Sequence, residues 1–547
     1  MNKMNQAKSF FLLLIAVAFG SAVFAQNIED GKKFFFYERY TSAKKIFSQL
    51  VTANTNNVDA VYWLGQTEIA MDDSIDAKTL YQQTLMANSG SGLLLAGIGQ
   101  LELMDGKTDD ARQRFETAIS LTKSKSIPVL NAIGFANIVT LYGDANYAID
   151  KLKLATTLKG FKDPDVYINL GDAYRKLFDG GAALDAYQSA LQLDNSSPIP
   201  SFKIGRLYES QGPSQEDVFI PRYNDAIAKD PTYGPVYYDL YNYFYKRDVN
   251  KSRDFLDKYI ANSDPDPKDC YYQASILYAS GLFQQSIAKS DECITADGNN
   301  PYPNLFGLKA YNYYKLGDSV NAKSFFDQYF AKQQPGKIGP GDYSTYASIL
   351  LKFPGNDSVA STYIDKAIAG DSLEGDKIKD AKVLLDYYSK DGNANGLGDA
   401  YKKIIAFRKT PVNSDYQSGG FYYYKAGNYA AAAAIFDSAT QRFPDNLYDY
   451  YMLGKSEWSV DSTMQLGLAN AAFEKVIELG ITDTVKNKDQ LIGSYKYFVA
   501  YYINIKKDKE TSLQYCDKIL SLDPADAETL KNKDIISKMK IKPVAGK

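Results

Sequence analysis

The sequence predicts an all-α fold in which antiparallel helix pairs stack into a right-handed solenoid. Two observations support this prediction. Small residues, usually glycine or alanine, recur beside larger residues at helical spacing, with a period of about 34 residues. The composition is that of a globular protein, with 45% hydrophobic and 23% charged residues among 547. We therefore expect a long array of helical repeats with an ordinary packed core.

The first 25 residues have the features of a cleaved export signal. Lys3 and Lys8 form a short basic region, residues 10–19 form an apolar core, and Val23 and Ala25 precede the expected cut. The apolar run is too short to span a membrane, and no other stretch approaches the roughly 18 residues that a spanning helix needs. We expect a protein that does not span the membrane, exported to the periplasm, with outer-membrane association or secretion as the alternatives.

The chain contains no histidine. This excludes Ser-His-Asp and Cys-His nucleophiles as well as histidine-ligated zinc or iron. No pair of carboxylates stands out as catalytic, and the net charge of −3 is unlike the basic footprint of a nucleic-acid binder. We therefore expect no enzyme activity, no cofactor, no metal and no nucleic-acid partner.

The clearest repeat is residues 164–198. Its small residues Gly171 and Ala183, twelve positions apart, let two antiparallel helices approach, while larger neighbours fill the gaps beside them. Those neighbours are Leu170, Tyr174, Tyr187 and Ala190.

The same pattern recurs along most of the chain, in roughly 13 units at this period. It is weakest at 231–300, 340–410 and 484–520. Clear copies contain Gly31, Ala43 and Phe47; Gly65, Ala77 and Tyr81; Gly99, Ala111 and Phe115; Ala136, Ala148 and Leu152; Gly205 and Tyr223; Gly420, Ala432 and Phe436; and Gly454 and Phe473.

With these motifs the chain resembles the tetratricopeptide-repeat family from about residue 27 to 540. The resemblance implies that partner peptides bind on the concave surface formed by the stacked first helices. The residue usage also resembles exported proteins of the Bacteroidetes group. The expected organisation is a signal peptide at 1–25, an N-terminal solenoid at 26–333, a proline- and glycine-rich joint at 334–342, a C-terminal solenoid at 343–524, and a capping helix with tail at 525–547.

Tyrosine is unusually common, with 45 residues. The stretch YYDLYNYFYKR at 237–247 is expected in the first helix of a pair, because Pro231 closes the preceding unit. Its phase is open. Counting forward from Pro231 points Tyr241 inward, whereas counting back from Leu256 turns Tyr241 and Tyr245 toward the groove.

The resemblance places ten aromatic side chains along the concave groove. Tyrosine and tryptophan suit such a surface because they offer large contact area with a polar tip. The alternatives are helix packing for any one of them, or sugar stacking as in the SusD-like glycan-binding proteins. We expect a scaffold for envelope or secreted proteins, in association with an outer-membrane complex. The ten residues are Tyr241, Tyr245, Tyr271, Tyr278, Tyr311, Tyr314, Phe421, Tyr424, Tyr451 and Trp458.

Two of the three cysteines are expected to form a disulfide. In the repeat register Cys270 and Cys293 fall on the two helices of one unit, at positions that face each other across the hairpin, and export favours oxidation. Cys516 takes the aromatic core position of the last unit, where we expect it to be buried and inert.

Overall fold

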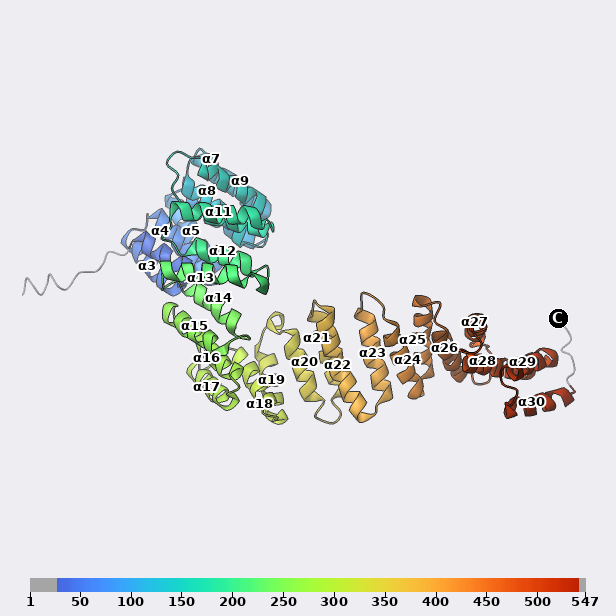
Figure 1. Cartoon of the computed structure of the whole chain (residues 1–547). Helices are drawn as coiled ribbons and strands as arrows, with labels where there is room; N and C mark the ends of the chain where they lie inside the picture. The colour runs from blue at the N-terminus through green and yellow to red at the C-terminus, as the bar shows by residue number, and fades with distance from the viewer. Residues whose placement is uncertain (1–26, 541–547) are drawn as a thin grey trace, which may run out of the picture. The chain divides into compact units, whose positions relative to one another are not determined.

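The computed structural model describes residues 27–540, and all regular structure in this range is helical. It comprises 29 α-helices, α2 to α30, with a few short 3-10 and π turns (Figure 1). The expected export signal lies outside the described residues. The chain divides into two compact units, one ending at Tyr302 and one beginning at Pro303. The all-α solenoid predicted from the repeat is confirmed.

Unit 1 consists of eight helix pairs, and the N-terminal member of each pair is called here the first helix. The pairs are α2 (Ile28–Phe36) with α3 (Tyr40–Ala53), α4 (Val58–Ala70) with α5 (Ser74–Ala87), α6 (Gly92–Met104) with α7 (Thr108–Leu121), α8 (Ile127–Val139) with α9 (Ala145–Thr156), α10 (Pro164–Lys176) with α11 (Gly180–Leu193), α12 (Ile199–Glu209) with α13 (Glu216–Lys229), α14 (Gly234–Phe244) with α15 (Val249–Asn262), and α16 (Pro267–Ala279) with α17 (Phe283–Ala296).

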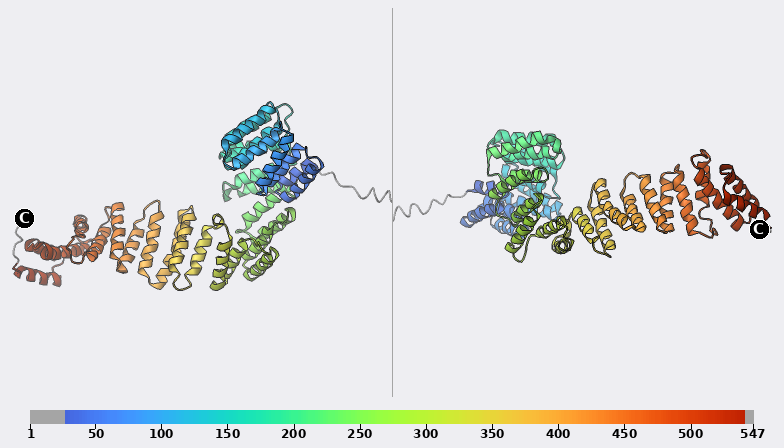
Figure 2. Two further views of the ribbon diagram at one scale, coloured as in Figure 1. Left: turned by 180° about the vertical axis from the view of Figure 1, so that it is seen from behind. Right: turned by 60° about the horizontal axis from the view of Figure 1, so that its bottom comes forward.

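Unit 2 consists of six further pairs and one final helix, and Figure 2 shows the pairs of each unit from two more directions. The helices are α18 (Asn304–Lys315) with α19 (Ser319–Lys332), α20 (Pro340–Leu350) with α21 (Asp357–Gly370), α22 (Glu374–Asp391) with α23 (Ala394–Phe407), α24 (Asn413–Lys425) with α25 (Tyr429–Arg442), α26 (Leu447–Val460) with α27 (Asn470–Gly480), α28 (Lys488–Tyr501) with α29 (Lys509–Leu522), and α30 (Ala527–Lys538).

Within a pair, the small residue of the first helix lies against the large residue of the second. A Cβ atom added at Gly171 would lie 2.3 Å from the Tyr187 ring, well inside van der Waals contact. The same holds for Gly65 and Tyr81, at 2.3 Å. Only glycine permits this approach, because any larger side chain would push the helices apart. The other predicted pairs in contact are Gly31 with Phe47, Gly99 with Phe115, Gly205 with Tyr223, Gly420 with Phe436 and Gly454 with Phe473.

Serine replaces the small alanine of the second helix in three pairs that lie in the weakly matching regions. The fully buried hydroxyl of Ser252 donates to the Tyr241 carbonyl at 2.8 Å. Ser286 donates in the same way to Ala274, and Ser512 to Val499, at 2.8 and 2.9 Å. Because serine is small and its hydroxyl finds an acceptor on the facing helix, the close approach of the two helices is preserved.

In α14 the phase counted forward from Pro231 is the one present. Tyr237 and Tyr241 are buried, whereas Asn242 is exposed. The helix therefore directs most of its tyrosines into the core, and its high β-propensity is overridden by packing against α15.

The predicted joint at 334–342 contains a 3-10 turn, Pro335–Lys337, and the first turn of α20. The boundary between the compact units falls earlier, between Tyr302 and Pro303. At the C-terminus α30 covers the last pair with the buried side chains of Thr529 and Ile536, and much of its remaining surface is exposed.

Candidate functional site

The first helix of unit 1 packs against helices almost 200 positions further along the chain. The Tyr37 hydroxyl donates to Asp230 Oδ2 at 2.7 Å, and Lys33 Nζ lies 2.9 Å from the same oxygen. The Tyr37 ring also meets the Tyr233 ring edge-on, with centroids 4.9 Å apart. In Figure 1 the blue helices at the start of unit 1 accordingly lie against the green helices α12 to α14. We call these contacts of Tyr37 and Lys33 the clasp.

A second set of contacts ties α3 to the loop after α15. Asp264 accepts hydrogen bonds from the Ser42 backbone N–H at 2.9 Å and from its hydroxyl at 2.5 Å, and Arg39 Nε lies 3.4 Å away. Together with the clasp, these contacts close the superhelical turn of unit 1 on itself.

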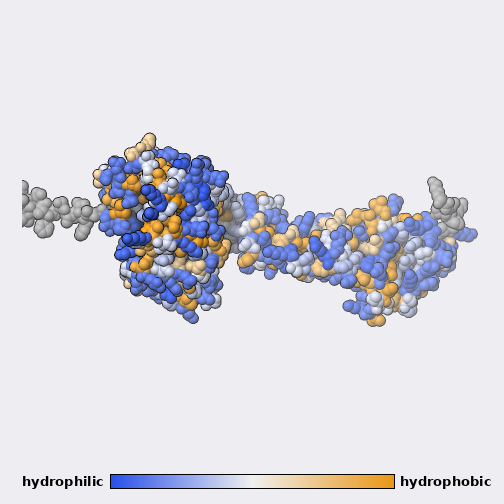
Figure 3. Space-filling view, turned by 90° about the horizontal axis from the view of Figure 1, so that it is seen from above, coloured by the Kyte–Doolittle hydropathy of each residue, from blue (hydrophilic) through white to orange (hydrophobic). Residues whose placement is uncertain are grey.

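Unit 1 contains a partly open cavity of about 640 Å³, which we call the lumen. Six consecutive first helices, α2 to α12, contribute side chains to it, and Tyr233 completes it just before α14. The volume is typical of ligand sites in proteins. Figure 3 shows apolar residues gathered on this part of the chain between polar ones. The apolar wall of the lumen is formed by Phe35, Phe36, Ile69, Met104, Phe135, Val139, Leu141, Ile168, Ile199 and Phe202.

Two cations of the lumen are already paired. Lys203 Nζ lies 2.7 Å from Asp172 Oδ2, and Arg206 Nε lies 3.3 Å from Asp239 Oδ2. Burial raises the pKa of Asp239 to about 6, although Arg206 opposes the shift. Each lumen cation therefore has a carboxylate partner within the chain.

Two lumen carboxylates are less well compensated. Burial raises the pKa of Asp165 to about 6, with a further rise from Asp163 and an opposing effect from Lys32, whose Nζ lies 3.8 Å away. Glu38 is open to the lumen but surrounded by protein, so burial raises its pKa as well, against Arg206 and Lys203. In both cases loss of hydration outweighs the nearby positive charge.

Two glutamine side chains face the lumen from neighbouring first helices. Gln66 Nε2 donates to the Tyr81 hydroxyl at 3.2 Å. Gln100 is only 2% exposed, and its Oε1 has no hydrogen-bond partner among the described residues. An unpaired buried acceptor is unusual in proteins, since it loses hydration without compensation.

A smaller cavity of about 190 Å³ adjoins the lumen and shares Phe36, Phe135, Asp165 and Asn169 with it. The acidic residues Glu29, Asp59 and Asp163 also line it, with Lys32 as its one basic lining residue. The negative charge of the lumen therefore continues into this recess.

Most of the ten predicted groove residues lie where one first helix meets the next. In unit 1, Tyr241 is 4% exposed and its hydroxyl lies 3.2 Å from Ser275 Oγ, while the Tyr245 hydroxyl donates to the Ser275 carbonyl at 3.0 Å. These bonds join α14 to α16. Tyr271 packs edge-on against Tyr302, and the Tyr278 ring packs at a tilt against Phe283.

In unit 2 the predicted residues of α18 also join neighbouring first helices. The Tyr311 hydroxyl donates to Asp342 Oδ1 on α20 at 2.7 Å. Lys352 Nζ lies 5.3 Å from the centre of the Tyr314 ring. Both tyrosines therefore contribute to the packing between successive helix pairs.

The remaining four predicted residues lie on α24 and α26. Lys455 lies 5.0 Å from the Tyr424 ring centre and 5.7 Å from that of Tyr451, so one cation links the two rings. Trp458 meets Tyr497 of α28 edge-on at 5.4 Å. Phe421 differs from the rest because its side chain is 44% exposed.

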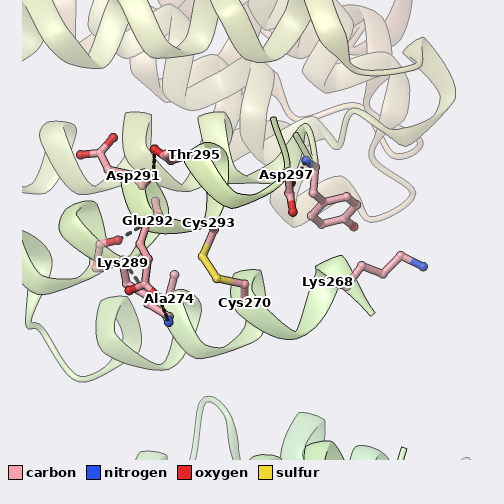
Figure 4. Close-up of a disulfide and its surroundings, with 12 residues drawn as sticks. Lys268, Cys270, Ala274, Lys289, Asp291, Glu292, Cys293, Thr295 and Asp297 are labelled. Carbon is pink, nitrogen blue, oxygen red and sulfur yellow. Dashed lines mark hydrogen bonds and ion pairs between the residues drawn. A yellow bond between two sulfur atoms is a disulfide. The ribbon is translucent and has the colours of Figure 1, made fainter. Parts of the chain in front are cut away.

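Cys270 of α16 and Cys293 of α17 form a disulfide, with their Cα atoms 5.8 Å apart (Figure 4). The bond joins the two helices of one pair, which is where the repeat register places these residues. Cys516 is free and buried, and burial raises the pKa of its thiol.

Sequence reasoning missed the lumen residues Glu38, Gln66, Gln100 and Asp165. They lie on first helices or next to them. Polar residues at first-helix positions of the early repeats are the sequence signal that could have pointed to them. Their convergence depends on closure of unit 1, for which the sequence carries no periodic mark.

None of the helices in the described range 27–540 is long and apolar enough to cross a membrane. Within the same range, no cluster of acidic or cysteine side chains is arranged to hold a metal ion.

Comparison with known proteins matches the tetratricopeptide-repeat family model to residues 164–197. No curated protein matches the chain. Among solved structures, the C-terminal part of a TPR repeat-containing protein from Cytophaga hutchinsonii is 26% identical over 48% of this chain and 98% of that one, with a TM-score of 0.27. A tetratricopeptide repeat protein from Parabacteroides merdae is 17% identical over 48% and 98% of the two chains, with a TM-score of 0.39. PilW, a type IV pilus biogenesis factor, is 18% identical over 38% and 92%, with a TM-score of 0.31.

Proposed function

We propose that this chain, whose residues 164–197 match the tetratricopeptide-repeat family model, is an exported, non-enzymatic scaffold that binds other proteins of the cell envelope through its first-helix surface. The periplasm is the proposed compartment, in keeping with the signal-like first 25 residues. Proteins of this kind bind other proteins.

The observation that carries the proposal is the convergence of six consecutive first helices on one lumen with an apolar wall. Repeats that turn the same helix inward create a continuous surface to which each unit adds a few side chains. Such a surface suits an extended or helical segment of a partner better than a small substrate, because contact is spread over many units.

The aromatic face of unit 2 offers a second contact surface. Phe421 is exposed on α24, the helix that also carries Tyr424, and Lys455 links the rings of Tyr424 and Tyr451. Most of the other predicted aromatics are occupied by neighbouring helices, which leaves little free ring face for a sugar. The protein-binding function is therefore favoured over the glycan-binding alternative.

Site-specific photo-cross-linking tests this function. A photoreactive amino acid is placed at Met104 in the lumen or at Phe421 in unit 2, and the matched control is Ile75, an exposed residue of the second helix α5. We expect discrete protein adducts from Met104 or Phe421 in intact envelopes, and none from Ile75. Equal adducts from all three positions, or none from the first two, would reject the proposal.

A further inference from the structure

The lumen contains hydrogen-bond acceptors and carboxylates that the donors and cations of the chain do not fully compensate. Its two cations, Lys203 and Arg206, are paired with Asp172 and Asp239. Glu38 makes no ion pair within the described residues, and the only cation near Asp165 is Lys32, at 3.8 Å. The adjoining recess adds further carboxylates. An anionic ligand would therefore meet cations that already have partners, whereas a cationic ligand would meet Glu38, which makes no ion pair, and Asp165, whose one ion pair is long.

Gln100 is an independent sign of a ligand. Gln100 is among the residues that line the lumen, and its buried Oε1 has no partner in the described chain. Leaving such an acceptor unpaired costs free energy, which an N–H group of a bound molecule would recover.

The backbone of Glu38 lies in the left-handed region. It has φ of +59° in the turn between α2 and α3, a conformation that favours glycine. Some equivalent turns have glycine there, as at Gly106, Gly317 and Gly427, whereas Asp72 and Phe178 adopt the same conformation with a side chain. Glycine would be less strained at this position, and Glu38 is among the residues that line the lumen.

We infer that the lumen binds a peptide segment in which a lysine, an arginine or a free amino group lies next to apolar side chains. The cation faces Glu38 and Asp165, Gln100 accepts a hydrogen bond from the segment, and the apolar wall around Phe135 and Phe202 holds its neighbours. Opposite charge is the feature of the lumen that selects this partner. The inference rests on the proposed scaffold function and specifies the chemistry of the segment that unit 1 takes.

The test uses three blocked hexapeptides with the full-length protein. One alternates leucine with lysine, one has norleucine in place of lysine, and one has glutamate in place of lysine. Binding is measured by isothermal titration calorimetry. We expect the lysine peptide to bind at least about tenfold more tightly than the norleucine peptide, since one charge contact of this kind is worth about a factor of ten. The glutamate peptide should bind most weakly.

The variants separate binding from folding. Glu38→Gly relieves the left-handed backbone and is expected to raise thermal stability while it weakens binding of the lysine peptide about tenfold. Its matched control is Phe178→Gly, because Phe178 has φ of +61° in the equivalent turn but is 97% exposed and does not line the lumen. That control should gain stability and keep full binding. Asp165→Asn should weaken binding as Glu38→Gly does.

Three results would overturn the inference. They are preference for the glutamate peptide, unchanged lysine-peptide binding in both Glu38→Gly and Asp165→Asn, or no binding of any peptide. In these cases adducts from Met104 would still leave the scaffold function standing, with another chemistry in the lumen. Conversely, lysine-peptide binding without envelope adducts would support the lumen chemistry and reject the scaffold function.

Discussion

The Tyr37 hydroxyl donates to Asp230 Oδ2 at 2.7 Å across 193 positions of sequence, and so joins the first helix pair of unit 1 to the end of the sixth. Burial raises the pKa of Asp230, but hydrogen bonds from Thr232, Lys33 and Tyr37 lower it by more, so the carboxylate stays ionised well below the usual range. The closing contact is therefore a charge-assisted hydrogen bond.

Removing the Tyr37 hydroxyl is expected to loosen α2. Tyr37→Phe keeps the ring on Tyr233 and deletes only the bond to Asp230, which should cost about 1–2 kcal/mol because Lys33 and Thr232 still hold the carboxylate. Hydrogen exchange in α2 should accelerate accordingly. Tyr142→Phe is the control, because its side chain is 55% exposed. Equal exchange in the two variants would show that the bond from the Tyr37 hydroxyl contributes nothing to closure.

The contact between Gly171 and Tyr187 predicts a large effect from a single methyl group. Gly171→Ala places a Cβ atom 2.3 Å from the ring, so the helices must separate, at a cost of about 1–3 kcal/mol. In the same repeat, Gly181→Ala meets only Asp179 at 3.7 Å and should stabilise α11 by up to about 1 kcal/mol. Thermal unfolding of the two variants should shift in opposite directions. A shared direction would contradict the packing argument.

Two of the predicted aromatic residues, Tyr311 and Phe421, should differ in their contribution to stability. Tyr311→Ala removes a bond to Asp342 and a ring that packs on Phe326, so we expect a loss of about 3 kcal/mol or more. Phe421→Ala should change stability by less than about 0.5 kcal/mol, because the side chain is largely exposed. Urea unfolding measures both. A large loss of stability in Phe421→Ala would show that the side chain contributes to packing and is not available at the surface.

The raised pKa of Asp165 predicts a pH-dependent stability of unit 1. A carboxyl group whose pKa rises to about 6 on folding stabilises the fold below its ordinary pKa, and this contribution is lost as pH rises through 6. The charges facing it are Glu29 and Asp163, which raise the pKa, and Lys32, which lowers it. We expect a loss of about 2 kcal/mol between pH 4 and pH 8 from this group.

Asp165→Asn should remove that dependence, because the amide does not ionise. Hydrogen exchange of α10, measured at several pH values and corrected for the intrinsic exchange rate, reports the local free energy. If the wild type and the variant lose the same stability between pH 4 and 8, the effect does not come from Asp165.

Reduction of the disulfide is expected to destabilise α16 and α17. Cys270 and Cys293 are 23 positions apart, and opening a loop of this length costs about 3 kcal/mol in the chain-entropy account. Exchange in both helices should accelerate when a reductant is added. The double variant Cys270→Ala, Cys293→Ala serves as control and should show the faster exchange with or without reductant. An oxidised wild type that behaves like this control would argue against the bond.

Much of the helix pairing could be predicted from sequence, because each pair depends on local spacing. Gly171 and Tyr187 are 16 positions apart, and so are Gly65 and Tyr81. Where the pairs were hard to see, the reason is chemical. Ser252, Ser286 and Ser512 take the place of alanine, and a serine hydroxyl can pair across the helices only if the facing carbonyl is near. In α23 the small and large partners change places, since Gly396 lies against Tyr388 of the preceding helix.

The aromatic residues illustrate the limit of counting positions. The repeat period places Tyr311 and Tyr424 on the first-helix side, but it does not say whether a side chain reaches solvent or the next helix. Tyr311 reaches Asp342, 31 positions on, and Lys455 is shared between Tyr424 and Tyr451. Such contacts depend on the rotation between successive pairs, which arises from packing.

By itself the sequence determined most of the helix pairs and the place of the Cys270–Cys293 bond, because these follow from residues within one repeat, but it left the phase of α14 open. Only the tertiary structure decided that unit 1 closes on itself and that Glu38, Gln100 and Asp165 face one lumen. Small rotations between successive pairs add up until Tyr37 meets Asp230, and the outcome depends on the sum of many packing contacts. No residue spacing or motif in the sequence corresponds to such a sum, so the closure of unit 1 could not be predicted from the sequence.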